Sequence, residues 1–278
     1  MRRAGLALAA TLALAGCGGG GESKPAGRDG AFSHPTRIDN RYFPLRPGTK
    51  FVYEGRTQGG RKRVEHRVVF VVTDLTKVID GVPTVVVWDR DLTKGKLVEG
   101  ELAFFAQDDA GRVLSEGEYP EEWEGRKLSG APSTWIPGLD GARAGVMMQA
   151  TPRPSKTTYS QGLAPKIDFA DRARIRTASA RTCVPTGCYR NVLVTEERSP
   201  DEPKARQIKY YAPGVGNVRV GFEGEGQNES LVLIELEHLG PAALARVSEQ
   251  ALALDRRGYS VSRKLYGRTP RAVRGSAG

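Results

Sequence analysis

Carboxylates and tryptophans gather in one part of this sequence, between residues 88 and 135. Eleven Asp or Glu residues lie from Asp89 to Glu124, in a stretch that is also rich in tryptophan. Paired carboxylates near aromatic side chains are what a glycosidase or a sugar-binding groove uses, because one carboxyl group acts as acid and the other as base or nucleophile. One hypothesis is therefore a hydrolase of glycan or lipid that uses carboxylates of residues 89–124. The candidate binding surface in this region consists of Trp123, Trp135, Glu116 and Glu118.

The same carboxylates have a plainer interpretation, which we favour. Acidic residues that alternate along an antiparallel strand usually form the face that water covers. On this interpretation the acids keep the strand soluble and perform no chemistry. We therefore assign no catalytic residue, and the sequence favours a protein that is not an enzyme.

The sequence predicts neither a cofactor nor a metal site. Asp89-x-Asp91-x-Thr93 begins like an EF-hand loop, but Lys94 replaces the glycine that such a loop requires. Gly214-Val215-Gly216 precedes a strand-like run rather than the helix that a dinucleotide site needs. The histidines, none of which has a metal-spaced partner in sequence, are His34, His66 and His238.

Alternating hydrophobicity predicts that most of the chain is β-sheet. The run from Val64 to Thr73 alternates so that one of its faces would lie in a core. Asp80-Gly81 is a hairpin signal, and further turn signals separate the strand-like runs that follow. The predicted fold class is mainly β: one large curved antiparallel sheet, a meander or half-barrel, over residues 31–240, with a C-terminal helix.

Three segments depart from the strand pattern. Residues 119–154 contain five prolines and five glycines, which predicts an insertion without regular structure, a feature that is often functional. An amphipathic helix is predicted over residues 241–258, because Pro241 suits its first turn and Gly258 its C-terminal end. Residues 259–278 are polar and basic, and we expect them to be disordered.

The first seventeen residues have the pattern of an export signal. Arg2 and Arg3 precede an apolar run from Leu6 to Leu14. This run is too short to span a bilayer, which needs about 20 residues, but it has the length of a signal-peptide core. Leu14-Ala15-Gly16-Cys17 resembles the lipobox of bacterial lipoproteins, in which the chain is cut before the cysteine and the thiol is acylated. An ordinary secretory signal with an incidental cysteine is the alternative.

The lipobox resemblance implies a signal peptide over residues 1–16 and a lipidated, Gly-rich tether over residues 17–30. Cys17 would then carry diacylglycerol and a fatty acyl group such as palmitate, and membrane lipid would be the partner of the acylated Cys17. The expected location is outside the cytoplasm, anchored to a bacterial membrane. The same compartment permits a disulfide, and we predict one between Cys183 and Cys188 at the tip of a hairpin, with Pro185 and Gly187 in the turn.

The net charge of +10 does not indicate a nucleic-acid-binding protein. Residues 256–274 hold seven Lys or Arg and no acid, and residues 1–30 add a net +2, which leaves about +1 for residues 31–255. A nucleic-acid binder concentrates its basic residues on the folded domain. We therefore expect no nucleic acid as partner.

Several short motifs resemble a group of uncharacterised secreted bacterial lipoproteins. They are Tyr42-Phe43-Pro44-Leu45-x-Pro47-Gly48-Thr49, Ala106-Gln107-Asp108 with Gly111-x-Val113, Gly117-Glu118, Asp140-Gly141-Ala142 and Lys209-Tyr210-Tyr211-Ala212-Pro213-Gly214-Val215-Gly216. The resemblance spans roughly residues 40–240 and implies that the β domain is one unit, but it brings no activity. At the level of fold alone, a long antiparallel sheet with a capping helix is similar to the half-barrels of lipoprotein carriers.

Three functional hypotheses follow. The first is a membrane-anchored lipoprotein whose β domain binds a ligand or partner without catalysis, the partner being an apolar ligand such as an acyl chain, or an envelope protein. The alternative is an envelope hydrolase that uses the carboxylates of residues 89–124. The third is a purely structural surface module. The first two differ in whether the sheet encloses an apolar cavity or presents two carboxylates about 5–10 Å apart.

Overall fold

The computed structural model describes residues 30–59, 62–200, 203–225 and 229–275. The signal peptide, Cys17 and nearly all of the tether lie outside the described residues. Within the described ranges, no helix is both long enough and apolar enough to cross a bilayer.

Most of the described chain forms one antiparallel sheet of 15 strands, which confirms the predicted fold class. The strands are β1 (Thr49–Gly59), β2 (Lys62–Ile79), β3 (Val82–Thr93), β4 (Lys96–Gln107), β5 (Val113–Glu124), β6 (Lys127–Gly130), β7 (Arg143–Met148), β8 (Tyr159–Ser160), β9 (Gly162–Leu163), β10 (Arg172–Val184), β11 (Gly187–Arg198), β12 (Ala205–Ala212), β13 (Gly216–Gly224), β14 (Ser230–His238) and β15 (Val273–Arg274). The helices are η1 (Pro165–Ile167), α1 (Pro241–Val261) and η2 (Tyr266–Arg268).

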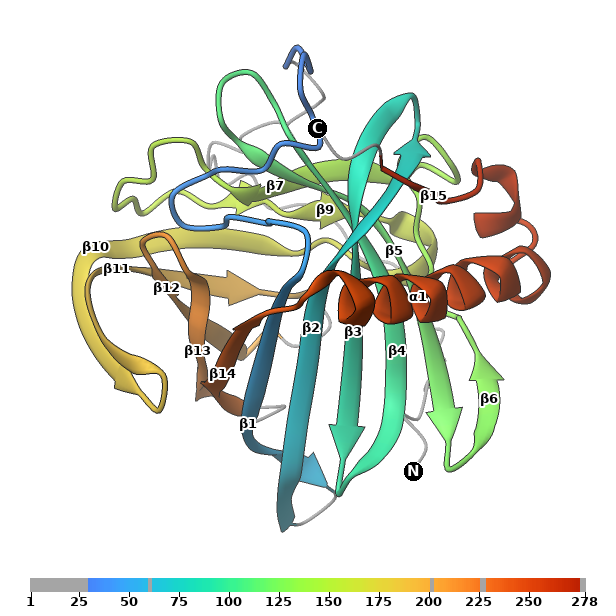
Figure 1. Ribbon diagram of the computed structural model, residues 1–278. Helices are drawn as coiled ribbons and strands as arrows, with labels where there is room; N and C mark the ends of the chain where they lie inside the picture. Colours follow the sequence, from blue (N-terminus) through green and yellow to red (C-terminus); the bar gives the residue numbers. More distant parts are fainter. Residues whose placement is uncertain (1–29, 60–61, 201–202, 226–228, 276–278) are drawn as a thin grey trace, which may run out of the picture.

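The sheet curves so strongly that its two edges approach each other (Figure 1). Its strand order is β8-β10-β11-β12-β13-β14-β1-β2-β3-β4-β5-β7-β9. The two outermost strands, β8 and β9, flank the single residue Gln161, so one short segment pairs with β10 on one side and with β7 on the other. The peptide chain itself therefore joins the two edges of the curved sheet.

The curvature creates an inner and an outer face, and each buries its own apolar cluster. The inner cluster includes Phe51, Phe105 and Leu193 and fills part of the concave side. The outer cluster includes Phe104 and Leu254 and lies beneath α1, which crosses β2 to β5 on the convex side (Figure 1). The strand of residues 64–73 is therefore covered on both faces from Val69 onward, whereas Glu65 and Arg67 remain exposed as its alternation predicted.

The structure overturns the predicted disorder of the C-terminal tail for residues 259–275. Helix α1 continues to Val261, and the chain then turns through η2 and adds β15 to the edge of β2. Tyr266 is fully buried, and its ring lies 4.4 Å from that of Tyr119. The sequence looked disordered because its basic residues outnumber these few apolar anchors.

A buried ion pair fixes this C-terminal segment to the sheet. Lys77 Nζ, on β2, lies 2.9 Å from Asp255 Oδ1 of α1 and also donates to the Tyr259 hydroxyl at 3.0 Å. Tyr266 donates a third hydrogen bond, of 2.7 Å, to the same Asp255 oxygen. Burial lowers the pKa of Lys77, and the charge of Asp255 opposes this shift.

Residues 119–154 are not a structureless insertion, contrary to the prediction. They contain the end of β5, the short strand β6 and the strand β7, which pairs with β5. The prolines and glycines of this segment lie mostly between its strands. Its composition therefore indicated the turns correctly but gave no sign of the strands. The segment forms part of the wall of the curved sheet.

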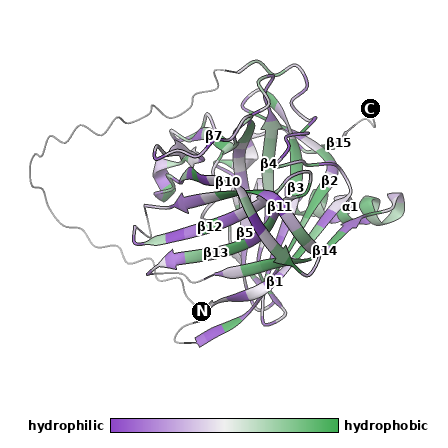
Figure 2. Cartoon of the chain, turned by 90° about the vertical axis from the view of Figure 1, so that its left-hand side faces the viewer, coloured by the Kyte–Doolittle hydropathy of each residue, from purple (hydrophilic) through white to green (hydrophobic). Residues whose placement is uncertain are grey.

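The predicted hairpin with Cys183 and Cys188 at its tip forms from β10 and β11. Cys183 and Cys188 are directly opposite each other in the register and are joined by a disulfide. Pro185 and Thr186 form the turn, and Gly187 has the positive φ of 146° that a glycine tolerates best. Hydrophilic stretches along β10, β12 and β13 are plain in Figure 2.

Candidate functional site

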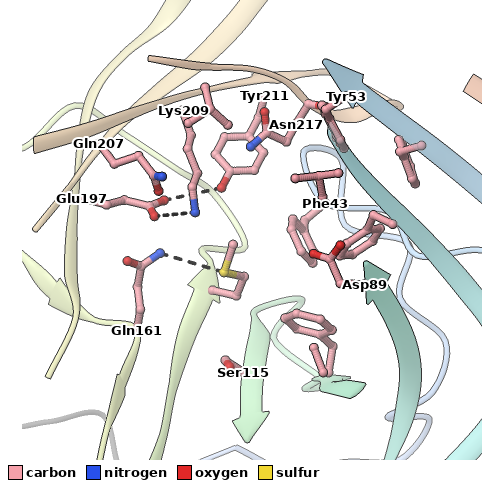
Figure 3. A pocket seen from close by; sticks show the side chains of 18 of the residues that line it. Phe43, Tyr53, Asp89, Ser115, Gln161, Glu197, Gln207, Lys209, Tyr211 and Asn217 are labelled. Carbon is pink, nitrogen blue, oxygen red and sulfur yellow. Dashed lines mark hydrogen bonds and ion pairs between the residues drawn. The ribbon is translucent and has the colours of Figure 1, made fainter. Parts of the chain in front are cut away.

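The concave side of the sheet encloses a cavity of about 420 Å³. Its walls come from β1 to β5 on one side and from β11 to β13 on the other, and the loop around Phe43 covers one end (Figure 3). Gln161 and Phe169, from the segment that joins the sheet edges, complete the lining. The curvature of the sheet therefore brings together residues from nearly the whole domain.

One wall of the cavity carries carboxylates from three neighbouring strands. Asp89 and Asp91 lie on β3, Glu101 on β4 and Glu118 on β5. In the register Asp89 is directly opposite Glu101. Like charges in directly opposite positions destabilise a sheet. These four acids were expected to face solvent, and this expectation was wrong, because the side of the sheet on which they alternate is its concave side.

Burial and mutual repulsion raise the pKa values of three of these carboxyl groups. Burial, helped by the charges of Asp91 and Glu99, raises the pKa of Asp89 to about 8. Burial and the charge of Glu118 raise the pKa of Glu101 well above its usual range. Burial also raises the pKa of Glu118, against the hydrogen bond that Trp135 donates to it. Near neutral pH, part of this wall therefore holds protons.

The opposite wall carries one cation, which already has a partner. Lys209 Nζ on β12 lies 2.7 Å from Glu197 Oε2 on β11. Burial lowers the pKa of Lys209, but the charge of Glu197 outweighs it and raises the pKa overall. The Tyr211 hydroxyl donates to the other oxygen of Glu197 at 3.5 Å (Figure 3). The positive charge of Lys209 is thus paired with a carboxylate of the same wall.

Aromatic side chains close the end of the cavity near the start of β1. The Phe43 ring lies 5.3 Å from the ring of Phe105 and 6.3 Å from that of Tyr211, so it links the two walls. The Gly214 N–H donates to the Arg41 carbonyl at 2.7 Å. The sequence motifs around residues 42–49 and 209–216, far apart in the chain, therefore meet at this end.

At the other end, a histidine lies between two acids of the cavity wall. His66 Nε2 is 3.1 Å from Glu229 Oε1 and 3.3 Å from Asp91 Oδ1. Burial lowers the pKa of His66, but the hydrogen bond with Glu229 and the charge of Asp91 raise it overall. The side chains of Asp91 and Glu229 remain 31% and 25% exposed, whereas Phe43 at the other end is only 7% exposed. The acidic end is therefore the more open one.

The predicted binding surface of Glu116, Glu118, Trp123 and Trp135 does not form. Glu116 and Gly117 together oppose the single residue Phe104, which makes a β-bulge between the Ala103–Glu118 and Phe105–Ser115 pairs. The bulge reverses the alternation, so Ser115 and Glu118 line the cavity while Glu116 is buried outside the lining. Gly117 permits it, since a side chain there would lie 2.7 Å from the Trp135 carbonyl oxygen.

The two tryptophans also go to separate places. Trp135 is buried, donates from Nε1 to Glu118 Oε2 at 3.0 Å and stacks on Phe169 with ring centroids 5.1 Å apart. It supports the cavity wall from behind. Trp123 lies on the outer face, near the Arg257 guanidinium of α1. Neither ring is placed to bind a ligand in the cavity.

The sequence did not identify several other residues that line the cavity. Glu197, Lys209, Asp171 and Glu229 contribute to the lining, and they come from segments that carried no motif of binding. The one available signal was the motif around Lys209 and Tyr211, which is now seen at the cavity. Among the described residues, no group of His, Cys, Asp and Glu is arranged to hold a metal ion.

Comparisons with known proteins give similarity at the level of fold only. No family model matches this chain, and no curated protein is similar to it in sequence. A solved structure of a candidate exported protein with a YmcC-like fold, from Bacteroides fragilis, is 13% identical with a TM-score of 0.38, and the match covers 71% of this chain and 99% of the other. A candidate lipoprotein from Parabacteroides distasonis is 13% identical with a TM-score of 0.33 over 71% and 99% of the two chains. A beta-barrel-like protein with a domain of unknown function, from Brucella abortus, is 8% identical with a TM-score of 0.36 over 70% and 100%.

Proposed function

We propose that this protein is an extracytoplasmic lipoprotein, held to a membrane through Cys17, whose curved sheet binds a small molecule without transforming it. The observation that carries the proposal is the cavity of about 420 Å³ inside the sheet. Its size falls in the range of about 300–1,000 Å³ that is typical of ligand pockets. Its lining combines aromatic and aliphatic side chains with convergent polar groups, among them seven carboxylates.

The lining argues for a small polar ligand over a bare acyl chain. An acyl chain would bury the carboxylates of Asp89 and Glu101 against hydrocarbon, and it would offer them no hydrogen bond. Burial of a polar group without a partner costs roughly 2–7 kcal/mol. The expected apolar ligand is therefore replaced in this proposal by a ligand that has polar atoms of its own.

The proposal can be tested by filling the cavity. Ala103 lines the cavity and is 4% exposed, so Ala103→Phe would occupy its space from within. Val78→Phe is the matched control, because Val78 is 38% exposed. Native mass spectrometry of protein taken from its own membrane should show a bound small molecule in the wild type and in Val78→Phe, and none in Ala103→Phe. An identical ligand load in all three would disprove binding in this cavity.

A second function, hydrolysis, is favoured by one specific observation. Glu101 and Glu118 lie on adjacent strands inside the cavity, two residue pairs apart in the register. Burial raises the pKa of both carboxyl groups, so the two are candidates to share a proton. A protonated carboxyl next to an ionised one can serve as general acid and base. Assays with chromogenic glycosides and esters test this, and turnover that disappears in Glu118→Gln would establish the hydrolase over the binding protein.

A further inference from the structure

We propose that the ligand of the cavity is an amphipathic organic cation, with an ammonium group held between Asp89, Glu101 and Phe70 and an apolar body that extends toward Phe43. This inference rests on the proposed ligand-binding function and names the chemical class of the ligand. It is carried by the order of residues across the cavity wall.

One row of side chains crosses four strands of the wall and changes from aromatic to acidic. Phe51 on β1 is directly opposite Phe70 on β2, and Phe70 is directly opposite Asp89 on β3. Asp89 is in turn directly opposite Glu101 on β4. Directly opposite residues have Cβ atoms about 4.5–5.5 Å apart. An aromatic face and two carboxyl groups therefore lie side by side along one stretch of the wall.

These are the groups that recognise an ammonium ion. A cation over an aromatic face is attracted by the ring quadrupole, and quaternary ammonium ligands are bound in this way. Burial raises the pKa of Asp89 and Glu101, but a bound ammonium ion favours their ionised forms, so these groups supply the opposite charge when the cation is present. Oδ1 of Asp89 is buried without a hydrogen-bond partner among the described residues, and its carboxyl group points into the cavity (Figure 3). A donor or a cation from a ligand would satisfy it.

The charge of the lining as a whole points to the same class of ligand. Seven carboxylates line the cavity and one lysine does. That lysine is Lys209, whose charge is paired with Glu197. The acids of the lining therefore outnumber its cations, and His66 lies within 3.3 Å of Asp91 and Glu229. An anionic ligand would meet this excess of negative charge, so the complementary ligand is a cation.

The wall also changes in character along its strands, which gives the ligand an apolar part. Along β4, from its end near Phe43 toward the turn with β3, the inward residues are Phe105, Ala103 and Glu101. The aromatic end is closed by Phe43, and the acidic end is the more exposed one. A ligand with one charged and one apolar end matches this gradient. A bare metal ion does not, because no described group of acids and histidines forms a metal cage.

Isothermal titration of the purified protein with three probes that share a phenylbutyl body tests the inference. The probes are 4-phenylbutyltrimethylammonium, the neutral 4-phenylbutan-1-ol and the anionic 5-phenylpentanoate. We expect the ammonium probe to bind, the alcohol to bind at least about ten-fold more weakly, and the carboxylate not to bind. Ala103→Phe should abolish binding of the ammonium probe.

Charge-neutralising variants locate the ammonium group. Asp89→Asn and Glu101→Gln keep the shape of the wall. Each should weaken binding of the ammonium probe about ten-fold and should have little effect on binding of the alcohol. Glu124→Gln is the control, because Glu124 is exposed at the end of β5. Thermal denaturation confirms that each variant is folded.

The possible outcomes separate this inference from the function on which it rests. If the alcohol binds as tightly as the ammonium probe, or if Asp89→Asn and Glu101→Gln leave the ammonium affinity unchanged, the cation inference is wrong and ligand binding stands. If no probe binds, the cation inference is also wrong, and the native ligand load of Ala103→Phe decides the proposed function separately.

Discussion

Lys209 and Glu197 form an ion pair inside the cavity, with 2.7 Å between Nζ and Oε2. The pair joins β11 and β12 and neutralises the lysine that lines the cavity. Lys209→Met would leave Glu197, which is 8% exposed, without its cation. We expect a loss of about 2 kcal/mol in the free energy of unfolding, because a buried charge loses its partner.

For the same variant, Lys209→Met, we also expect tighter binding of a cationic probe, since the wall becomes more negative. Urea denaturation and titration measure the two effects, and weaker cation binding by a folded variant would contradict the charge argument.

Thermal stability should fall as the pH rises from about 4 to about 8. The pKa of Asp89 is raised to about 8 in the folded protein, whereas in the unfolded chain it lies near its ordinary value of 3.8. The folded state therefore binds the proton more tightly, and its advantage is complete below pH 4 and is lost as the pH rises through 8. Asp89→Asn should reduce this decline in Tm, whereas Glu124→Gln should not. An equally steep decline in Asp89→Asn would exclude this carboxyl group as the cause.

Stability should also fall in strong acid, for the opposite reason. Glu196 is buried, which by itself opposes its ionisation, but hydrogen bonds from Arg174, Arg176 and Arg198 lower its pKa to about 2. Its contribution to stability is present above its ordinary pKa of 4.5 and is lost as the pH falls toward 2. Scanning calorimetry between pH 2 and 5 should show this loss, and Glu196→Gln should lessen its slope while lowering Tm at pH 6.

The buried pair of Lys77 and Asp255 should be essential for the C-terminal layer. Asp255→Ala leaves the Lys77 ammonium, whose side chain is 0% exposed, without its partner. Breaking such a pair costs about 3–5 kcal/mol. We expect that loss in urea denaturation, together with faster hydrogen exchange in residues 262–275. The double variant Lys77→Met/Asp255→Leu should recover most of the stability, and a failure to recover would place the cost in packing and not in charge.

The anchor is testable independently of the cavity. Cys17→Ala should abolish acylation and move the protein from the detergent phase to the aqueous phase on partitioning, because the acyl chains supply the membrane affinity. Cys183→Ser/Cys188→Ser is a suitable control, since it removes the other two cysteines and should leave partitioning unchanged. A Cys17→Ala protein that stays in the membrane in its mature form would contradict the lipoprotein assignment.

The strands and turns could be predicted from the sequence because their signals are local. Asp80 and Gly81 have the positive φ angles of 45° and 84° that a tight hairpin turn requires, and their residue types announce this. The shared face of Asp89, Asp91, Glu99 and Glu101 was also predictable, because it follows from a period of two. Which face of the sheet is concave was not, because the curvature depends on how distant strands pair.

Two further features required the structure for physical reasons. The bulge at Glu116 and Gly117 shifts the alternation by one residue, and a glycine in a strand signals a bulge without fixing its effect on the neighbouring side chains. The order of the C-terminal tail was not predicted, because its basic residues are typical of a disordered segment. Its signal was on another strand: Lys77 stands between Leu75 and Ile79, both buried, and a lysine in such a row needs a buried acid from elsewhere.

The pairing of β15 with β2 has a consequence for the order in which the protein folds. The Gly275 N–H donates to the Asp74 carbonyl at 2.7 Å, and Arg274 binds the Asp74 carboxylate. The chain between these residues must be complete before the contact can form, and closing so long a loop is slow. A nascent chain that ends before Asp255 leaves the Lys77 ammonium in an apolar row without its acid. A chain truncated before α1 therefore exposes the surface of β2 to β5 that α1 would cover.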